Sequence, residues 1–530
     1  MKKRTPKLIL LVCVICSFTH TYGVEYSVGR LIKKNRTGYT PYISASSTSS
    51  GKRLWIHTSQ NVENGRAIQL KVDPSTGDAI VVGYFEGTLT LMGLELQSSE
   101  STGFILRCNA KGEGLWAKKI SSTKESLIHS LTLDNSGNIY FSGYSESASS
   151  IESKTLTSQL GSFLTKLTPQ GNIDWVHVDE EAVFGASVVY DKIGNTIFWQ
   201  KVRENESVNN AYYSQIEKIS TTNQSLWTKS IEGHMLHRVT IHHPHSELYI
   251  TVDNNGNPIH GQVEAYALSD GSWKKQLVVR KYDAFSQELL FEKVIATTDG
   301  INNLSVKNNL LNIRDIASYA DGSIMVLSLF SKDVILHDST GDKTISSKGQ
   351  RDILITKLDE NSSLIFANWY GDSKNDYANF IGHNQTHQII GGCFYGNLTI
   401  ENDQFTGSSS SPKVYHTYYA QLPRLASNEE IADTEGGSIT TSNTFNLYPN
   451  PATKDQPISL LYDFKENHTY QVVAYNTEGM AIKSLGFYHF GSSGSVTSAS
   501  VPLNGLNSGI YILNLFEGDQ LVSQNKLLIK

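Results

Sequence analysis

Apolar and polar residues alternate along most of this chain in short runs, and Asp, Asn, Gly, Ser or Thr bound each run. An alternation with a period of two places the apolar side chains on one face of a β-strand. The bounding residues are typical of tight turns, because they accept positive φ angles or hydrogen-bond their own backbone. The pattern therefore predicts an all-β protein with many short strands.

Two landmarks recur through the middle of the chain. The first is an Asp, a short turn and an apolar strand, as in LTLDNSGNIYFSGY from Leu131. The second is an alternating strand, a polar turn and a strand that starts near an aromatic residue, as in SFLTKLTPQGNIDWVHV from Ser162. Six aromatic residues mark the second landmark: Trp55, Trp116, Trp175, Trp227, Phe291 and Phe366. We expect the recurring Trp residues to pack in the core, and the recurring Asp residues (Asp73, Asp134, Asp191 and Asp321) to hydrogen-bond their own turns.

The repeated unit is too small to fold alone. It holds about four short strands, and one such sheet cannot bury its own apolar face, so neighbouring sheets must stack. A radial stack is a β-propeller. The six aromatic landmarks predict six blades, with seven as the alternative. We expect the strand GKRLWIHTS from Gly51 to complete the last blade and close the ring.

The repeats resemble a family of β-propeller repeats in secreted bacterial proteins, the SBBP repeats. The resemblance lies in the D-x-x-G-N-I-Y-x-x-G-Y strand, the F-L-x-K-L strand and the G-N-x-x-W turn. It covers roughly residues 30–425, is best from 66 to 180 and is poorest from 235 to 300. It implies that residues 24–425 form a propeller domain.

The pattern changes near the C-terminus. Residues 426–444 are polar and rich in Gly, Ser and Thr, which is typical of a linker. Residues 445–530 hold about seven short strands, which favours a small immunoglobulin-like β-sandwich.

This last segment closely resembles the type A sorting domain of the type IX secretion system. The resemblance rests on these residues: Leu447, Tyr448, Pro449, Asn450, Pro451, Ala452, Gly509, Ile510, Tyr511, Lys526 and Lys530. It implies that the type IX machinery of a Gram-negative bacterium is a partner, and that the protein reaches the cell surface or the medium through the periplasm and outer membrane. In that family the domain can be cleaved, and the cargo is then released or attached to surface lipopolysaccharide.

Residues 1–23 have the features of a secretory signal peptide. Four basic residues precede the apolar run LILLVCVIC, and Thr21 and Gly23 are small residues suited to a cleavage site. The apolar run is too short to span a bilayer, and we expect no transmembrane segment in the mature chain.

Charge and cysteine content narrow the function classes. The net charge is −6 without a long basic run beyond the N-terminus, which disfavours nucleic acid binding.

Of the four Cys, Cys13 and Cys16 lie in the signal peptide, so Cys108 and Cys393 remain. We favour two separate buried thiols. A disulfide is the alternative, because ring closure through the Gly51 strand would place the two cysteines in neighbouring blades.

Candidate chemistry is sparse. A His-rich stretch offers weak metal-ligand candidates: His234, His237, His242, His243 and His245. Asp253 begins a sequence similar to a calcium loop, but the Gly is misplaced and the distal Glu is missing, so a plain turn is favoured. The chain has no G-x-S-x-G elbow and no phosphate-binding Gly loop, and we expect no cofactor.

These observations favour an exported, non-catalytic binding or adhesion protein whose ligand is a glycan or a protein. The alternative is an extracellular hydrolase or lyase, directed at glycans or peptides, that is built on the propeller. A structural component of a surface layer is a third hypothesis.

Overall fold

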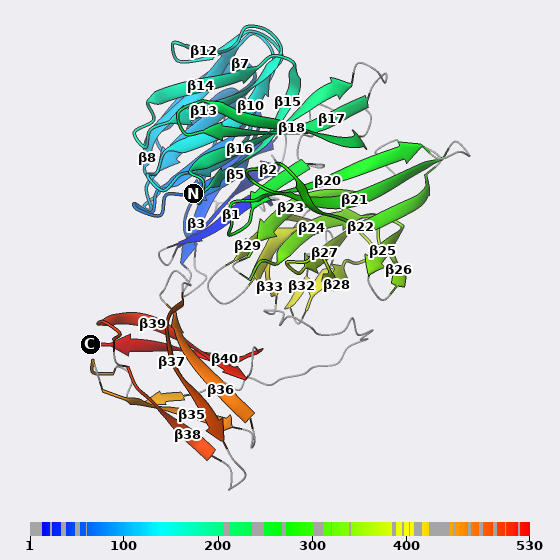
Figure 1. The fold of residues 1–530 in the computed structure, drawn as a ribbon. Coiled ribbons are helices and arrows are strands. Elements are labelled where there is room, and N and C mark those ends of the chain that lie inside the picture. The colour runs from blue at the N-terminus through cyan, green and yellow to red at the C-terminus, as the bar shows by residue number, and fades with distance from the viewer. Residues whose placement is uncertain are drawn as a thin grey trace, which may run out of the picture. The chain divides into compact units, whose positions relative to one another are not determined.

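The structure is a computed structural model of the 530-residue chain. It describes residues 13–21, 24–32, 39–47, 53–59, 61–205, 211–235, 248–267, 272–301, 311–319, 321–338, 341–383, 388–394, 397–401, 403–406, 416–422, 446–448, 452–454, 456–464, 468–475, 481–490, 496–503, 505–517 and 520–530. This part of the chain forms 40 strands and no helix, which confirms the all-β prediction (Figure 1). None of the described segments is therefore an apolar helix able to cross a membrane.

The chain divides into two compact units, Met1–Pro423 and Arg424–Lys530. In the described part of the first unit, seven larger sheets follow one another along the chain. The first sheet has the order β1-β2-β3-β4: Cys13–Thr21, Val24–Ile32, Tyr39–Ser47 and Arg53–Thr58. The second has the order β5-β6-β7-β8-β11-β12: Val62–Val72, Ala79–Leu91, Leu94–Cys108, Gly114–Ser122, Ser149–Ile151 and Lys154–Thr157. The third has the order β9-β10-β13-β14: Ser126–Leu133, Ile139–Ser145, Gly161–Leu167 and Ile173–Asp179.

The remaining sheets of this unit repeat the arrangement. The fourth is β15-β16-β17-β18: Ala182–Asp191, Thr196–Asn205, Ala211–Ser220 and Ser225–Met235. The fifth is β19-β20-β21-β22-β25-β26: Leu248–Val252, Pro258–Ala267, Trp273–Tyr282, Leu289–Ile301, Asp333–Asp338 and Gly341–Ser346. The sixth is β23-β24-β27-β28: Leu311–Ser318, Ile324–Phe330, Asp352–Leu358 and Leu364–Tyr370. The seventh is β29-β30-β33, Asp376–His383, Gln388–Phe394 and His416–Leu422, and β31, Asn397–Ile400, pairs with β32, Asp403–Thr406.

The first strand of each sheet contacts the first strand of the next. The contacts run β1, β5, β9, β15, β19, β23 and β29, and β29 contacts β1. This cyclic order is that of a propeller, in which each chain segment runs from the centre outward and returns to the centre in the next sheet. The propeller-like fold predicted from the repeats is therefore present.

The apolar core lies between consecutive sheets rather than within any one of them. Ile80 and Ile105 of the second sheet pack with Ile128 and Phe141 of the third, for example. Similar clusters join each later pair of neighbouring sheets up to the seventh. Stacking is thus what buries the apolar face of each alternating strand, as the sequence pattern requires.

The aromatic landmarks lie on the fourth strand from the centre in each of the first six sheets, on β4, β8, β14, β18, β22 and β28. One prediction about them is wrong. The strand around Trp55, β4, pairs with β3 of the first sheet and does not complete the last one. The last sheet instead has three strands of its own, β29, β30 and β33, which carry no such landmark.

The strand β1 lies within the predicted signal peptide and pairs antiparallel with β2. It also supplies the contact between the first sheet and β29. Cleavage after Gly23 would remove β1 and leave β2 as the first strand of its sheet. The signal peptide itself stays a prediction.

The C-terminal unit consists of two sheets that share one core. The first has the order β34-β35-β38: Asn446–Tyr448, Ile458–Phe464 and Val496–Val501. The second has the order β37-β36-β39-β40: Ala481–Phe490, His468–Tyr475, Gly509–Glu517 and Gln520–Ile529. Leu460 and Val501 of the first sheet belong to the same buried cluster as Val472 and Leu515 of the second.

Candidate functional site

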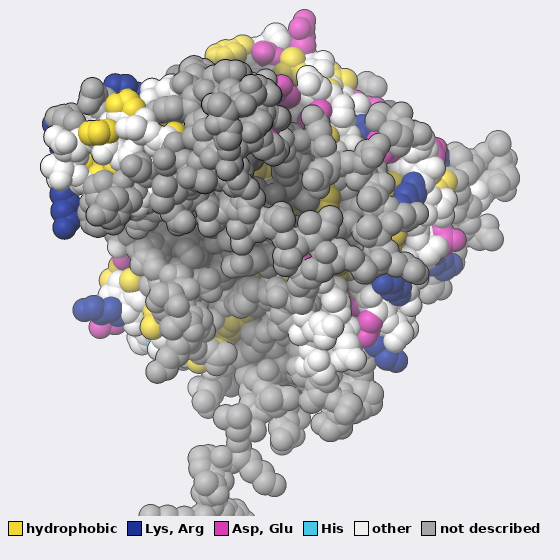
Figure 2. All heavy atoms as spheres, turned by 90° about the horizontal axis from the view of Figure 1, so that it is seen from below, with side chains coloured by type: hydrophobic (Ala, Val, Ile, Leu, Met, Phe, Trp, Pro, Cys, Tyr) yellow, Lys and Arg dark blue, Asp and Glu magenta, His cyan; other side chains and the backbone are white. Residues whose placement is uncertain are grey.

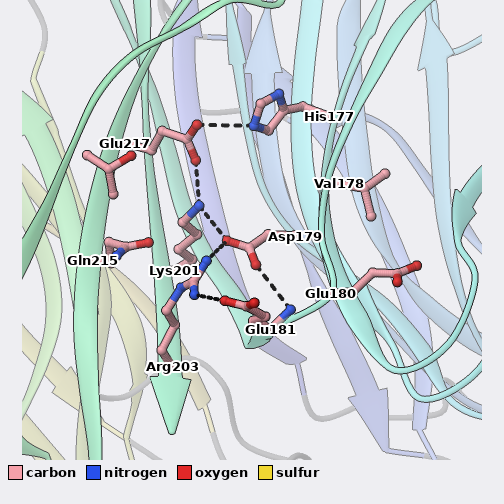
Figure 3. Close-up of a pocket in the computed structure, with 10 residues that line it drawn as sticks. His177, Val178, Asp179, Glu180, Glu181, Lys201, Arg203, Gln215 and Glu217 are labelled. Carbon is pink, nitrogen blue, oxygen red and sulfur yellow. Dashed lines mark hydrogen bonds and ion pairs between the residues drawn. The ribbon is translucent and has the colours of Figure 1, made fainter. Parts of the chain in front are cut away.

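A polar cavity of about 500 Å³ lies where the third and fourth sheets of the N-terminal unit meet (Figure 3). Strand β14 and the turn after it form one wall, and β16, β17 and β18 form the other. The lining residues are His177, Val178, Asp179, Glu180, Glu181, Lys201, Arg203, Gln215, Glu217 and Thr228. We call these residues the polar pocket.

The alternation of β16 explains how charged residues reach this wall. Phe198 and Val202 face the core on one side of the strand, so Lys201 and Arg203 lie on the opposite side, with Trp199. Lys201 is directly paired with Gln215 of β17. The period-two pattern thus places a basic residue of one strand beside polar residues of the next, on the face that meets β14.

Lys201 lies at the centre of the pocket. Its Nζ is 2.6 Å from Oδ2 of Asp179 and also bonds Oε2 of Glu217. The ammonium also lies 4.7 Å from the ring centroid of Trp199. Because the side chains of all three charged groups are at least 92% buried, their mutual attraction acts in a low dielectric.

Asp179 has a second cationic partner. Nη2 of Arg203 lies 2.6 Å from Oδ2 of Asp179, and Nη1 bonds Glu181. The other carboxylate oxygen, Oδ1, accepts the backbone N–H groups of Glu181 and Ala182, both at 3.1 Å. The carboxylate therefore fixes the turn between β14 and β15 as well as the two basic side chains.

His177 closes the network on the β14 side. Its Nε2 is 3.1 Å from Oε1 of Glu217, and its Nδ1 is 2.8 Å from Oδ1 of Asn223. Asn223 donates its own amide to the carbonyl of Val176, which fixes its oxygen toward the histidine. Both ring nitrogens then face acceptors, so the charged imidazolium fits this geometry best. The hydrogen bond to Glu217 raises the pKa of His177 accordingly.

The two buried carboxyl groups of the pocket, Asp179 and Glu217, are held ionised. Burial by itself would raise the pKa of Glu217, but the bonds from His177 and Lys201 outweigh it and lower that pKa to about 2. Burial opposes ionisation of Asp179 as well, yet Lys201 and Arg203 lower its pKa. Neither group would hold a proton near neutral pH, whereas sugar hydrolysis by a carboxyl pair requires one protonated acid.

Two polar atoms of the pocket are left without a hydrogen-bond partner. They are Nε of Arg203, a donor, and Oε1 of Gln215, an acceptor, and both are buried. At the rim, Glu180 and Glu181 are exposed. The pocket therefore offers one unused donor and one unused acceptor beside charges that already neutralise one another, which suits a neutral polar ligand.

Sequence reasoning did not find this pocket. Its residues come from four strands in two sheets, and no single stretch carries a recognisable motif. The available signal is weak: charged residues occupy inward positions of alternating strands, at Lys201, Arg203 and Glu217.

The recurring Asp residues make the turn bonds that were predicted. Oδ1 of Asp73, Asp134, Asp191 and Asp321 accepts a backbone N–H two residues further on. Asp253 does the same, and its Oδ2 lies 2.6 Å from Nζ of Lys281.

The recurring Trp residues join neighbouring sheets. The indole N–H groups of Trp175 and Trp227 donate to carbonyls of the next sheet, Thr221 and Ala284, each at 3.0 Å. Lys218, directly opposite Trp227, donates to the same Ala284 carbonyl at 3.0 Å. The landmark is thus a device for packing the sheets together.

The predicted metal candidates cannot be placed. His237, His242, His243 and His245 lie outside the described residues, and His234 is on β18 with a side chain that is not described. Within the described ranges no group of His, Cys, Asp and Glu has the arrangement of a metal site.

Cys108 on β7 and Cys393 on β30 are both buried, and each is a thiol in this structure. The first sheet lies between theirs, since β1 contacts both β5 and β29. The alternative of a disulfide depended on ring closure through the strand from Gly51, and that closure is not observed. Counting thiols in the unfolded chain with Ellman's reagent tests the pairing: two without a bridge, none with one.

The sorting-motif residues come together in the C-terminal unit. Gly509, Ile510 and Tyr511 begin β39, which pairs with the final strand β40 that contains Lys526. Ala452 forms a parallel bridge with Ile529, and its carbonyl accepts the N–H of Lys530 at 2.9 Å. Leu447 and Tyr448 are on β34, and Pro449, Asn450 and Pro451 lie outside the described residues. The two ends of the module thus pair with each other.

The family of secretion system C-terminal sorting domains matches residues 446–530. This chain carries a type IX secretion sorting domain. The domain indicates that the type IX machinery is a partner and that the protein is exported to the cell surface or the medium. A search of the curated proteins found no match to the chain.

Several solved structures are similar in part. A puromycin hydrolase shares 10% identity over 86% of this chain and 58% of its own, with a TM-score of 0.42. The β-propeller domain of the Trilobed protease from Pyrococcus furiosus shares 8% identity over 76% of this chain and 100% of its own, at 0.40. An acylaminoacyl peptidase from Pyrococcus horikoshii shares 10% identity over 72% of this chain and 58% of its own, at 0.34. The chain thus spans less than two thirds of the hydrolase and of the peptidase.

The exposed surface agrees with the low net charge. On the face seen in Figure 2, the Lys and Arg side chains of the described residues lie scattered among Asp and Glu side chains. They form no broad basic area on the described part of that face, which is what recognition of a phosphate backbone would require.

Proposed function

We propose that this protein is a non-catalytic binding protein of the cell surface or the medium, and that its propeller-like unit holds a glycan or protein ligand in the polar pocket. The observation that carries the proposal is that the unused donor of Arg203 and the unused acceptor of Gln215 both line this pocket, from the neighbouring strands β16 and β17. A hydroxyl group or a peptide amide can satisfy both, because each of these groups donates and accepts.

The protonation states support binding over hydrolysis. A glycosidase needs an acid with a raised pKa opposite an ionised carboxylate. In the polar pocket the two buried carboxylates, Asp179 and Glu217, both bond Lys201 and both have lowered pKa values. The alternative of a hydrolase or lyase would therefore need a different site.

Binding is tested with the exported chain purified from the medium or the cell surface. It is applied to a glycan array and to a peptide library, and the best ligand is titrated by calorimetry. We expect Gln215→Leu, which removes the acceptor but keeps the size of the side chain, to weaken that ligand by about tenfold, since a lost hydrogen bond in a buried site costs about 1–2 kcal/mol. Glu288→Gln, at an exposed turn on the fifth sheet, is the matched control and should bind normally.

Two outcomes oppose the proposal. Release of sugar or peptide fragments from the same libraries, at a rate that Lys201→Met lowers, would establish a hydrolase or lyase. Binding that Gln215→Leu leaves unchanged would place the ligand elsewhere.

We further propose the domain layout that the sequence predicts: a signal peptide at 1–23, an SBBP-like propeller at 24–425, a linker at 426–444 and an immunoglobulin-like sorting domain at 445–530. Seven successive sheets in the described part of the first unit support seven blades over six, and cleavage after Gly23 would leave β2 as the innermost strand of the first sheet. The two-sheet core of the C-terminal unit supports a sandwich.

Export provides a sharp test of this layout. Removing residues 446–530 should leave the protein in the periplasm, whereas the full chain should reach the surface or the medium. Mass spectrometry of the fractions gives both locations and the first residue of the mature chain. Equal distribution of the two forms would contradict the assignment.

A further inference from the structure

One end of the ring of innermost strands gathers basic side chains away from the polar pocket. Arg66 lies in the first half of β5, and Arg314 lies in the first half of β23. Arg351 directly precedes β27, which runs in the same direction as β23 because both pair antiparallel with β24. In four-stranded antiparallel sheets joined from outermost to innermost strand, successive innermost strands start at the same end. These three residues therefore share one end of the ring, and we call them the arginine cluster.

Both other members of the cluster act on the charge of Arg314. Arg314 interacts with Arg66 and Arg351, and also with Tyr249 at the start of β19 and Tyr377 at the start of β29. Nη1 of Arg351 donates to the hydroxyl of Tyr377 at 3.1 Å. Burial first, and then repulsion from the other two guanidinium groups, lower the pKa of Arg314. Residues far apart in the sequence thus place three like charges within reach of one another.

Arg314 is poorly satisfied by the protein. Its Nε is buried and has no hydrogen-bond partner, and no described carboxylate is among the groups that shift its pKa. The neighbouring Asp315 does not act on Arg314: its charge partner is Lys71, and its Oδ2 accepts the backbone N–H of Ile381 on β29 at 2.8 Å. A β-bulge at Arg314, between Ile313 and Asp315, takes this residue out of the pairing with β24. A β-bulge changes the direction of a side chain, and bulges are frequent next to active sites.

We propose that the arginine cluster binds an oxyanion, the sulfate, phosphate or carboxylate group of a ligand, at this end of the ring. A guanidinium whose Nε is buried without a partner, and which lies among like charges, is unfavourable alone; an anion removes both the repulsion and the missing hydrogen bond. The planar fork of arginine matches the oxygens of these three groups in a bidentate manner. The site lies on β5, β23 and the segment before β27, so it goes beyond the polar pocket and does not depend on it.

The test titrates the purified exported chain with sodium sulfate, inorganic phosphate and acetate at constant ionic strength against sodium chloride. We expect a saturable rise in the thermal unfolding midpoint with at least one of the three anions, and the anion that gives the largest rise identifies the group. Arg314→Gln should reduce the affinity for that anion by at least tenfold. Lys111→Gln, at an exposed turn, is the control and should leave the titration unchanged.

A second readout separates binding from a structural role. In the absence of the three anions, Arg314→Gln should keep or increase the unfolding midpoint, because it removes an uncompensated, partly buried charge. If the variant fails to fold, Arg314 has a structural role and the proposal is wrong. A rise that is equal for chloride and the oxyanions, or equal in wild type and Arg314→Gln, would also overturn it. Gln215→Leu should not affect the anion titration, so a failure of the polar-pocket proposal can be told apart from a failure of the arginine-cluster proposal.

Discussion

The polar pocket and the arginine cluster bury charge in opposite ways. In the pocket, Lys201 lies between Asp179 and Glu217, and the charges of both signs are satisfied by one another. In the cluster, Arg314 meets Arg66 and Arg351 without an ion-pair partner among the described residues. The charges of the first arrangement are balanced without a ligand, although Nε of Arg203 and Oε1 of Gln215 stay unpaired, and the arrangement stabilises the junction of two sheets. The second is incomplete, and only a bound anion would complete it.

The largest expected effect comes from breaking the balanced arrangement. Lys201→Met should destabilise the N-terminal unit by about 3–5 kcal/mol, because it leaves two buried carboxylates without their shared cation. Urea unfolding followed by tryptophan fluorescence measures this change. Arg314→Gln provides the contrast and should cost nothing in an anion-free buffer. Similar losses in both variants would show that the two clusters do not differ as described.

The second-largest effect should be a loss of folding stability at low pH, which arises in the polar pocket. Folding lowers the pKa of Glu217 from 4.5 to about 2. Its contribution to folding stability is therefore present at a pH above 4.5, and it is lost as the pH falls from 4.5 toward 2. The loss amounts to about 3 kcal/mol, since each pKa unit corresponds to about 1.4 kcal/mol. Unfolding free energies measured between pH 6 and 2 should fall less steeply for Glu217→Gln than for wild type. An unchanged slope would contradict the assigned ion pair.

His177 acts in the opposite direction. The pKa of His177 is raised in the folded state. Its contribution to folding stability is therefore complete at a pH below the pKa of the unfolded chain, and it is lost as the pH rises through the pKa of the folded state. The stabilising effect of the pocket network should therefore be greatest between the acid and the histidine transitions. His177→Gln should remove the decline on the alkaline side, as measured by unfolding between pH 6 and 9.

The smallest expected losses of stability come from neutral hydrogen bonds between sheets, and the losses at the charged clusters can be compared with them. Trp175→Phe removes a hydrogen bond of 3.0 Å to the Thr221 carbonyl and should cost about 1 kcal/mol. Trp116→Phe should cost less, because its bond to the Pro169 carbonyl is 3.4 Å long and Arg107 donates to the same oxygen at 2.9 Å. Thermal unfolding of the two variants ranks them, and the reverse order would contradict this account.

Much of the fold follows from local pattern. The Asp turns and the Trp strands are short-range features, and each recurs in the structure where the sequence predicts it. The strand GKRLWIHTS was misplaced for a physical reason. Its alternation fits any outer strand, and the hydrogen-bond partner of a strand depends on which edge is available in three dimensions. In the structure that edge belongs to β3, and the last sheet forms from β29, β30 and β33.

The sequence by itself determined the all-β class, the repeat and the sorting domain, because each depends on spacing within one stretch of chain or on a set of matching residues. Only the tertiary structure decided the two charged clusters. His177 and Glu217 lie on different sheets, and so do Arg66 and Arg314, and no periodicity relates the members of either pair. Whether a charge is neutralised or left uncompensated depends on distances and burial, which the chain acquires only when its sheets stack.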